Sequence, residues 1–174
     1  MEDVAAIFSD CSYARKCWCA YWYKPNRDYK AGWGNANRAG LEQLVQDGLE
    51  PGIIAYVDGE AAAWLSIAPR RQFDRLNRSN SLAPVDDEPV WSMNCFVVKK
   101  AYRKMGMMRA LIAGGIDFAR QKGGKVLEAY PLDAQRKVLA DELFVGTLAA
   151  FADMGFVEAA RRLPTRPIMR LRLD

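Results

Sequence analysis

A short basic loop centred on Gly106 holds the residues whose types and spacing best suit chemistry. An apolar run at residues 95–98 precedes the loop, and an amphipathic helical pattern follows it, from about residue 107 to residue 122. The free N–H groups at the start of a helix, together with the helix dipole, attract an anion. Formal positive charge comes from Arg103, Lys104 and Arg109. The spacing therefore predicts a phosphate-binding loop between a strand and a helix, in which Gly106 allows a close backbone approach.

Two segments resemble the GNAT family of N-acetyltransferases, whose members take an acetyl group from acetyl-CoA. The first, Arg103-Lys104-Met105-Gly106-Met107-Met108, is similar to the family's motif of an Arg or Gln, two variable residues, Gly, one variable residue and a small residue. Met108 departs from that motif. Residues 151–156, Phe-Ala-Asp-Met-Gly-Phe, resemble the end of the family's last helix. Further likeness, at residues 17–22, 64–70, 128–131 and 146–147, is to a bacterial subgroup of the family.

The order of the elements indicates a single α/β domain over residues 1–174, and the resemblance places its acetyl-CoA-binding core at about residues 90–156. The strand–helix–strand at 90–130 must be a right-handed parallel crossover if both strands share a sheet. We expect a mixed, mostly antiparallel sheet of six or seven strands, with a central parallel pair and helices on both faces. This organisation resembles the acyl-CoA N-acyltransferase fold. The expected strands are 17–22, 52–57, 61–68, 90–98, 125–130, 156–161 and 168–173. The expected helices are 35–46, 109–122 and 146–154, with a short helix and surface loop at 69–89 and a loop at 132–142.

The resemblance implies that acetyl-CoA is the co-substrate and that its pantetheine arm lies along the strand before the basic loop, in the manner of strand addition. A backbone N–H of that strand would then contact the thioester carbonyl. Many relatives have a tyrosine at position 151 that protonates the CoA sulfur, and Phe151 stands there in this chain. Tyr130 or Tyr102 could replace that acid. The predicted cofactor-binding residues are Phe96, Val97, Val98, Arg103, Lys104, Met105, Gly106, Met107, Met108, Arg109 and Phe151.

Acetyl transfer to an amine also requires that the amine lose a proton. Many relatives place a carboxylate base on the strand before the loop, but the corresponding residue here is Ser92. Ser92 and Asn94 could hold a water that relays the proton, or they could form a polar strand edge. Glu128, between Leu127 and Ala129 in the next strand, is the best single carboxylate. It is a candidate base or acceptor anchor, and a structural ion pair is the alternative.

The acceptor pocket is expected to draw on aromatic residues. Candidates for its lining are Trp18, Tyr21, Trp22, Trp64 and the segment 69–73. The same tryptophans could instead pack the core. Arg70 and Arg71 could bind a carboxylate of the substrate, although exposed arginines usually only contact solvent.

Composition limits the possible chemistry. The 174 residues include no histidine, which excludes Ser-His-Asp and Cys-His schemes and removes the commonest zinc ligand; Cys95 would therefore lack an activator as a nucleophile. Cys17-Trp-Cys19 does not have zinc-knuckle spacing, so a core or pocket-lining role is favoured over metal or redox chemistry, and no metal is expected. No apolar run approaches the ~20 residues of a membrane span, and the acidic first residues do not resemble a secretory signal. We therefore expect a cytoplasmic protein.

The predicted function is an acetyl-CoA-dependent N-acetyltransferase that transfers acetyl directly to the amine of a small molecule or peptide. A CoA-binding sensor without catalysis is the alternative, since the usual tyrosine and strand carboxylate are missing. The net charge of +4 is too small to indicate nucleic acid, so we expect neither nucleic-acid nor membrane partners, and a monomer or homodimer. A nucleic-acid surface would have to use Arg161, Arg162, Arg166, Arg170 and Arg172, which alternate with apolar residues as solvent-facing strand positions do.

Overall fold

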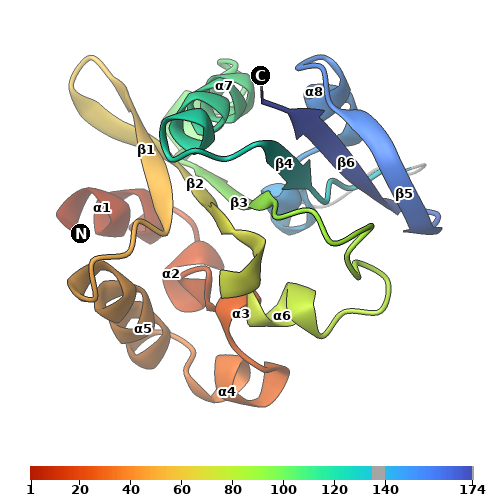
Figure 1. Ribbon diagram of the computed structural model, residues 1–174. Helices are drawn as coiled ribbons and strands as arrows, with labels where there is room; N and C mark the ends of the chain where they lie inside the picture. Colours follow the sequence, from red (N-terminus) through yellow and green to blue (C-terminus); the bar gives the residue numbers. More distant parts are fainter. Residues whose placement is uncertain (135–139, 174) are drawn as a thin grey trace.

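The computed structural model describes residues 1–134 and 140–173 and is shown in Figure 1. Its strands are β1 (Gly52–Val57), β2 (Glu60–Pro69), β3 (Trp91–Val98), β4 (Val126–Ala129), β5 (Val157–Leu163) and β6 (Arg166–Arg172). Its α-helices are α1 (Glu2–Ser9), α2 (Ala14–Cys17), α3 (Ala20–Tyr23), α4 (Asn26–Ala31), α5 (Asn35–Gln46), α6 (Asp74–Asn77), α7 (Met107–Gln121) and α8 (Leu148–Ala152). Short 3-10 helices are η1 (Arg70–Gln72), η2 (Lys100–Tyr102) and η3 (Ala140–Val145). None of the described helices is both long and apolar enough to cross a membrane.

The six strands form one sheet in the order β1-β2-β3-β4-β6-β5. Among the strands of the described residues, only β3 and β4 are parallel neighbours, and α7 is the crossover between them. The other neighbouring strands are antiparallel. The mixed, mostly antiparallel sheet with a central parallel pair is therefore confirmed.

Helices cover both faces of the sheet, and each face has its own apolar core (Figure 1). The N-terminal helices pack on one face, where Phe8, Trp64 and Tyr130 are buried. Helices α7 and α8 pack on the other face, over Leu65 and Met93. Strand β2 runs between the two cores and is buried along nearly all of its length. Strands β2 and β3 thus form the buried centre of the fold, around which the candidate site lies.

Local sequence explains several of these elements. The β1–β2 hairpin turns at Asp58 and Gly59, which have φ of 50° and 81° as the two-residue hairpin turn requires. In α7 the buried residues, among them Leu111, Ile112 and Ala119, recur at helical spacing. Gly115 lets α7 approach the sheet closely, since a Cβ there would lie 2.6 Å from Met93 Cε. The predicted bounds of α5 and β1 agree with the structure.

The prediction of a strand at residues 17–22 is wrong. This segment forms the ends of two short helices, α2 and α3, and Trp18 and Cys19 between them have φ of 49° and 58°. Local backbone bonds satisfy the chain here, from Trp18 N–H to the Ala14 carbonyl and from Trp22 N–H to the Cys19 carbonyl. The aromatic residues are buried because this helical segment packs on the sheet, so tertiary packing overrides their strand propensity.

The segment that follows β4 differs in part from expectation. The helix expected at residues 146–154 is confined to α8, where the Thr147 hydroxyl accepts a hydrogen bond from Ala150 N–H at 3.3 Å. The predicted loop at 132–142 includes residues 135–139, which lie outside the described residues. Leu132 pairs with Thr147 in an isolated bridge, and η3 follows from Ala140.

Candidate active site

Strands β3 and β4 part at the centre of the sheet. Their parallel pairing ends at Met93 and Ala129, whereas β3 continues to Val98. At the same point β3 has a β-bulge against β2, in which Asn94 is the extra residue between Met93 and Cys95. Within the described chain, no strand therefore pairs with the β4 side of residues 94–98, which we call the open edge of β3, and η3 packs nearby. Backbone groups on this edge can hydrogen-bond an extended polar ligand.

Side chains of β3 line two cavities, one on each face of the strand. Phe96 and Val98 line the first, which we call the loop cavity. Cys95 and Val97 line the second, which we call the aromatic cavity. Phe144 of η3 lines both cavities. Two ligands could therefore meet at the open edge of one strand, which is the geometry that a transfer between two bound molecules needs.

The loop cavity, of about 400 Å³, extends over the basic loop predicted from the sequence. Gly106 precedes α7 with a φ of 78°, and Lys104 is also left-handed, with a φ of 64°. A Cβ on Gly106 would meet no atom within 4 Å, so the backbone there borders open space. No side chain caps the start of α7, which leaves its first N–H groups available to an anion. Loop residues that line the cavity are Arg103, Lys104, Gly106, Met107 and Met108.

Other predicted loop residues lie at its margin. The Met105 side chain is exposed and does not line the cavity. Met107 and Met108 are half-buried and pack against the core beneath α7. The Arg109 guanidinium forms an ion pair with Asp153 on the surface, so its charge is already partly neutralised.

Phe151 is fully buried and does not line either cavity. Its ring packs edge-to-face against Phe96, with ring centroids 5.8 Å apart, and against Phe156 at 5.1 Å. Phe151 thus packs against Phe96, a residue that lines the loop cavity, without lining that cavity itself. The two tyrosines considered as replacement acids differ in position. Tyr130 is buried in the sheet. Tyr102 lines the loop cavity, although its hydroxyl donates a hydrogen bond to Glu60 at 2.7 Å.

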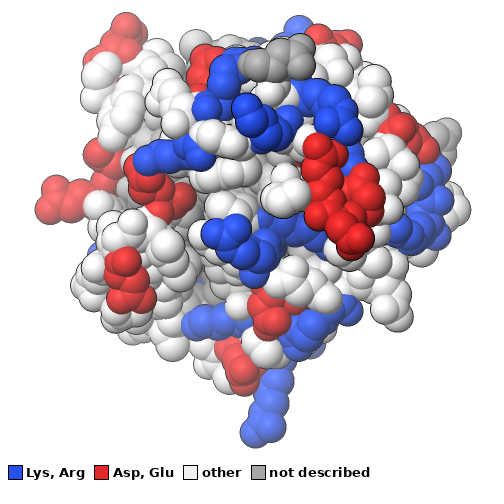
Figure 2. All heavy atoms as spheres, viewed as in Figure 1, with Lys and Arg blue, Asp and Glu red and all other residues white. Residues whose placement is uncertain are grey.

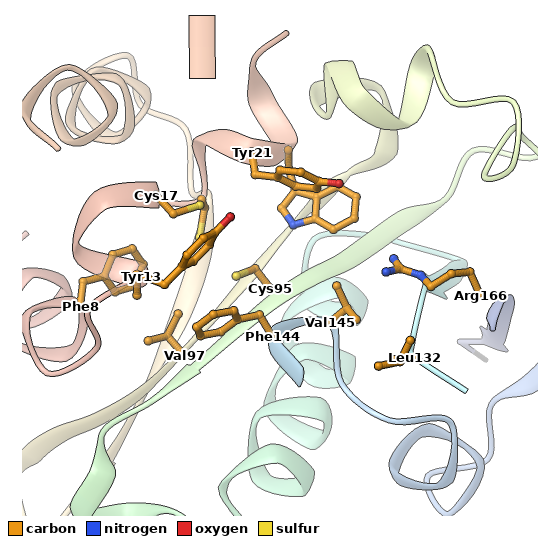
Figure 3. Close-up of a pocket in the computed structure, with 13 residues that line it drawn as sticks. Phe8, Tyr13, Cys17, Tyr21, Cys95, Val97, Leu132, Phe144, Val145 and Arg166 are labelled. Carbon is orange, nitrogen blue, oxygen red and sulfur yellow. The ribbon is translucent and has the colours of Figure 1, made fainter. Parts of the chain in front are cut away.

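The aromatic cavity, of about 290 Å³, lies between β3 and the N-terminal helices (Figure 3). Tyr21 and Trp22 line it, as expected, whereas Trp18 and Trp64 are buried in the core beside it. Phe8, Tyr13 and Leu132, which the sequence did not indicate, also line it. The Tyr13 ring stacks on Phe144 at 5.7 Å, and its hydroxyl lies 2.6 Å from that of Tyr29.

Three thiols, those of Cys17, Cys19 and Cys95, face the aromatic cavity. Burial raises the pKa of the Cys17 thiol to about 11. A hydrogen bond with Cys19, and then burial, raise the pKa of the Cys95 thiol well above its usual range. Both thiols are therefore neutral near pH 7 and poor nucleophiles. Among the described residues no group of His, Cys, Asp and Glu side chains could hold a metal ion.

Glu128 lies in a buried polar network and not in either cavity. Its Oε2 accepts hydrogen bonds from Arg70 at 3.2 Å and from the Tyr130 hydroxyl at 2.7 Å, and its Oε1 accepts from Arg170 at 2.8 Å. The Ser92 hydroxyl lies 2.8 Å from that of Tyr130. Burial, and then the Glu128 charge, raise the pKa of Tyr130. The structural ion pair considered from the sequence describes this geometry better than a free base does.

Arg70 does not offer its charge to a ligand, contrary to the expectation that it could bind a substrate carboxylate. Besides Glu128 and Tyr130, it donates to the carbonyls of Leu76 and Leu82 at 3.0 and 2.6 Å. Arg71 is exposed and borders neither cavity. The sequence could not show this, because it gives the charge of a side chain and not its partners.

The side-chain amide of Asn94 can form hydrogen bonds that the described residues do not supply. Its side chain is 1% exposed, and neither its amide nitrogen nor its oxygen has a hydrogen-bond partner among the described residues. A buried amide of this kind usually binds water or a ligand. Its place in the bulge puts this capacity at the point where β3 and β4 part.

The C-terminal arginines are not an unpaired basic stripe. Arg161 pairs with Asp133 and Glu158, Arg170 with Asp86 and Glu128, and Arg172 with Glu88. Figure 2 shows acidic side chains directly beside basic ones on this face. The pairing leaves little free positive charge for a nucleic-acid backbone.

Arg166 differs from these arginines. It lines the aromatic cavity, and its Nε is buried without a hydrogen-bond partner. In Figure 3 its guanidinium points toward the middle of the cavity. Burial lowers the pKa of Arg166, which nevertheless stays charged near pH 7.

A profile of the acetyltransferase (GNAT) family matches residues 2–140 of the chain. The chain therefore belongs to this family. Similar solved structures include an acetyltransferase from Salmonella typhimurium, yncA, with its cofactor acetyl-CoA, at 21% identity and a TM-score of 0.57 over 99% of this chain and 90% of that one. Ribosomal-protein-alanine N-acetyltransferase from Brucella melitensis has 20% identity and a TM-score of 0.56, over 99% and 95% of the two chains. The paia N-acetyltransferase from Thermoplasma acidophilum, in complex with coenzyme A, has 13% identity and a TM-score of 0.55, over 98% and 93%.

No protein with a curated description matches the chain significantly. The likeness to the solved structures supports the acyltransferase fold and the mixed sheet, which agrees with the architecture expected from the sequence. The family match ends before residues 151–156, so the second sequence resemblance lies outside it.

Proposed function

We propose that the chain is an acetyl-CoA-dependent N-acetyltransferase that transfers acetyl directly to the amine of a small molecule. The observation that carries this proposal is the open edge of β3, with the loop cavity on one face and the aromatic cavity on the other. Acetyl-CoA would occupy the loop cavity, and the acceptor the aromatic cavity. The four cysteines are free and buried, which is consistent with the cytoplasm, the compartment that we propose.

In this proposal the pyrophosphate of acetyl-CoA binds the backbone N–H groups at the start of α7, with Arg103 and Lys104 beside them. The pantetheine arm runs along β3 from Val98 toward Asn94. A backbone N–H on that edge stabilises the negative charge that develops on the thioester oxygen.

We assign removal of the amine proton to the β-bulge in β3, at Asn94. Asn94, whose side-chain amide has no partner among the described residues, holds a water that relays the proton of the amine to bulk solvent. Ser92 and Glu128 act indirectly, because their bonds to Tyr130 and the arginines fix the strand pair from which Asn94 projects. The CoA thiol is acidic enough to leave without a dedicated acid, which is consistent with Phe151 at the usual tyrosine position. The raised pKa values of the cysteine thiols favour direct transfer over an acetyl-cysteine intermediate.

Substitution Gly106→Glu tests the loop assignment. It adds a negative charge and backbone strain at a left-handed position beside the proposed pyrophosphate. We expect acetyl-CoA binding, measured by calorimetry, to weaken at least about 100-fold, or about 2.7 kcal/mol.

Gly48→Glu is the matched control, because Gly48 has nearly the same φ, 77° against 78°, and equally open space around it. That variant should bind acetyl-CoA as the wild type does. Equal affinity of the Gly106→Glu variant and the wild type would remove the loop from its proposed role. A CoA-binding sensor remains the alternative function, and it predicts normal binding with no CoA release in the presence of any amine.

A further inference from the structure

Arg166 is the arginine that lines the aromatic cavity, and its guanidinium has no partner among the described residues. The described part of the chain contains no ion pair and no side-chain hydrogen bond of Arg166. Arg75, on the neighbouring helix, donates to the Tyr21 carbonyl and to Asn26, both at 2.5 Å. Arg78 pairs with Asp74 at 2.8 Å. Among the described residues that line the aromatic cavity, Arg166 is thus the cation that remains available to a ligand.

The position of Arg166 also distinguishes it. It lies at the start of β6, where the aromatic cavity adjoins a second, more polar cavity that contains Arg78, Ser79 and Ser81. Tyr21 and Trp22 line both cavities beside it. In Figure 3 the guanidinium and the Tyr21 ring border the same end of the aromatic cavity, whereas Cys95 marks the floor formed by β3.

Arg166 is partly buried, and its Nε is buried without a hydrogen-bond partner among the described residues. Partial desolvation of an unpaired charge is costly, and the cost is offset when an anion binds. The planar guanidinium fits the two oxygens of a carboxylate especially well. Burial lowers the pKa of Arg166, which agrees with this partial loss of solvent. Apart from three cysteine thiols, the other side chains that line the aromatic cavity are aromatic or aliphatic, which favours an apolar remainder of the ligand.

We infer that the acceptor is an amino acid with an apolar or aromatic side chain, and that Arg166 binds its carboxylate. This inference rests on the acetyltransferase function proposed above. The carboxylate would lie at the Arg166 end of the cavity and the amine would face the open edge of β3. The cavity volume of about 290 Å³ suits a single amino acid.

The test uses pairs of amines that differ only in the carboxylate: L-phenylalanine with phenethylamine, and L-leucine with isoamylamine. Release of free CoA gives kcat/KM for each. We expect the wild type to prefer the carboxylate-bearing member of each pair at least about tenfold, since a site built to bind a polar group rejects analogues that lack it. Arg166→Gln should abolish this preference by lowering kcat/KM for the amino acids alone. Its KM for acetyl-CoA should not change.

Arg166→Lys keeps the charge but not the paired donors and should retain part of the preference, which provides a second variant if Arg166→Gln folds poorly. Arg71→Gln, an exposed arginine outside both cavities, should retain all of it. Equal use of both members of each pair by the wild type would overturn the inference and leave the acetyltransferase function standing. An equal loss of kcat/KM for both members of each pair in Arg166→Gln would also overturn the inference and leave the acetyltransferase function standing.

If no amine releases CoA, the proposed function fails, and the carboxylate site is then tested by binding. Calorimetry would measure the affinity of CoA-loaded protein for N-acetyl-L-phenylalanine. We expect at least about tenfold weaker binding by Arg166→Gln than by the wild type, and unchanged binding by Arg71→Gln. Equal affinity of the wild type and Arg166→Gln, or no binding to the wild type, would overturn the carboxylate site.

Discussion

Glu128 is fully buried in the centre of the sheet because arginines from two distant segments meet its carboxylate. Arg70 follows β2 and Arg170 lies on β6, so the network joins both halves of the chain. A carboxylate in this position stabilises the fold only while it is charged and paired. The residue that looked like the best base in the sequence is therefore better understood as part of the framework.

Replacement Glu128→Gln should destabilise the protein by about 3–5 kcal/mol, because it leaves the buried Arg70 guanidinium without a carboxylate and removes one of the two carboxylates that contact Arg170. Urea unfolding measures this loss. Glu42→Gln, which breaks the exposed pair with Arg38, is the control and should change stability by less than about 0.5 kcal/mol. An unfolding midpoint for Glu128→Gln equal to that of the wild type would contradict this role.

The raised pKa of the Cys17 thiol predicts how the free energy of unfolding changes at alkaline pH. Its folded pKa of about 11 lies above that of a free thiol, about 8.5–9, so the unfolded chain loses this proton first as pH rises. The stabilising contribution of the neutral Cys17 thiol is therefore complete below about pH 8.5 and is lost as pH rises to about 11. This loss lowers the free energy of unfolding by about 2 kcal/mol. Cys17→Ala should unfold with a smaller decrease in stability over this range, as measured by urea titrations at pH 8 and 11. Equal decreases in the two proteins would refute the assignment.

At the residue scale, the sequence identified the side chains around Gly106 because helix starts and basic charge leave a local pattern. It missed Arg166 as a ligand site because its importance depends on what the other arginines contact. Arg170 and Arg166 lie four residues apart on one strand, yet the first is bound to Asp86 and Glu128 and the second points into a cavity. Pairing of this kind depends on the folded structure.

At the scale of elements, β3 is the part of the fold on which the site depends. The sequence predicted this strand and the parallel crossover through α7, since both follow from apolar periodicity. The bulge at Asn94 and the separation from β4 were not predictable, because register between distant strands determines them. The helical form of residues 17–22 was missed for a similar reason, since its aromatic residues bury themselves against that sheet.

Phe144 of η3 provides a test at this scale, because it lines both cavities. Its ring is half-buried and stacks on Tyr13, so Phe144→Ala should raise KM for both acetyl-CoA and the acceptor, each about tenfold, without unfolding the protein. Val157→Ala, at an exposed position on β5 that borders neither cavity, should leave both values unchanged. A change in only one KM would show that Phe144 does not border both ligands.

At the scale of the whole molecule, the two halves of the chain contribute different parts of the site. The N-terminal helices form one wall of the aromatic cavity, while β3 and α7 form the loop cavity. Family resemblance in the sequence was concentrated in the second half, so the cofactor side could be predicted in more detail than the acceptor side. Most lining residues of the aromatic cavity come from segments whose fold the sequence left open or, at residues 17–22, predicted wrongly as a strand.

The central claim is that acetyl passes from CoA to an amine across the open edge of β3. The most direct test is to quantify free CoA and N-acetylated amine together by mass spectrometry, in reactions of acetyl-CoA with the amino acids named above. We predict equal amounts of the two products with the wild type and with Gly48→Glu, and neither product above background with Gly106→Glu. Acetyl-CoA binding without N-acetylated product from any amine, or CoA release without such a product, would contradict the account.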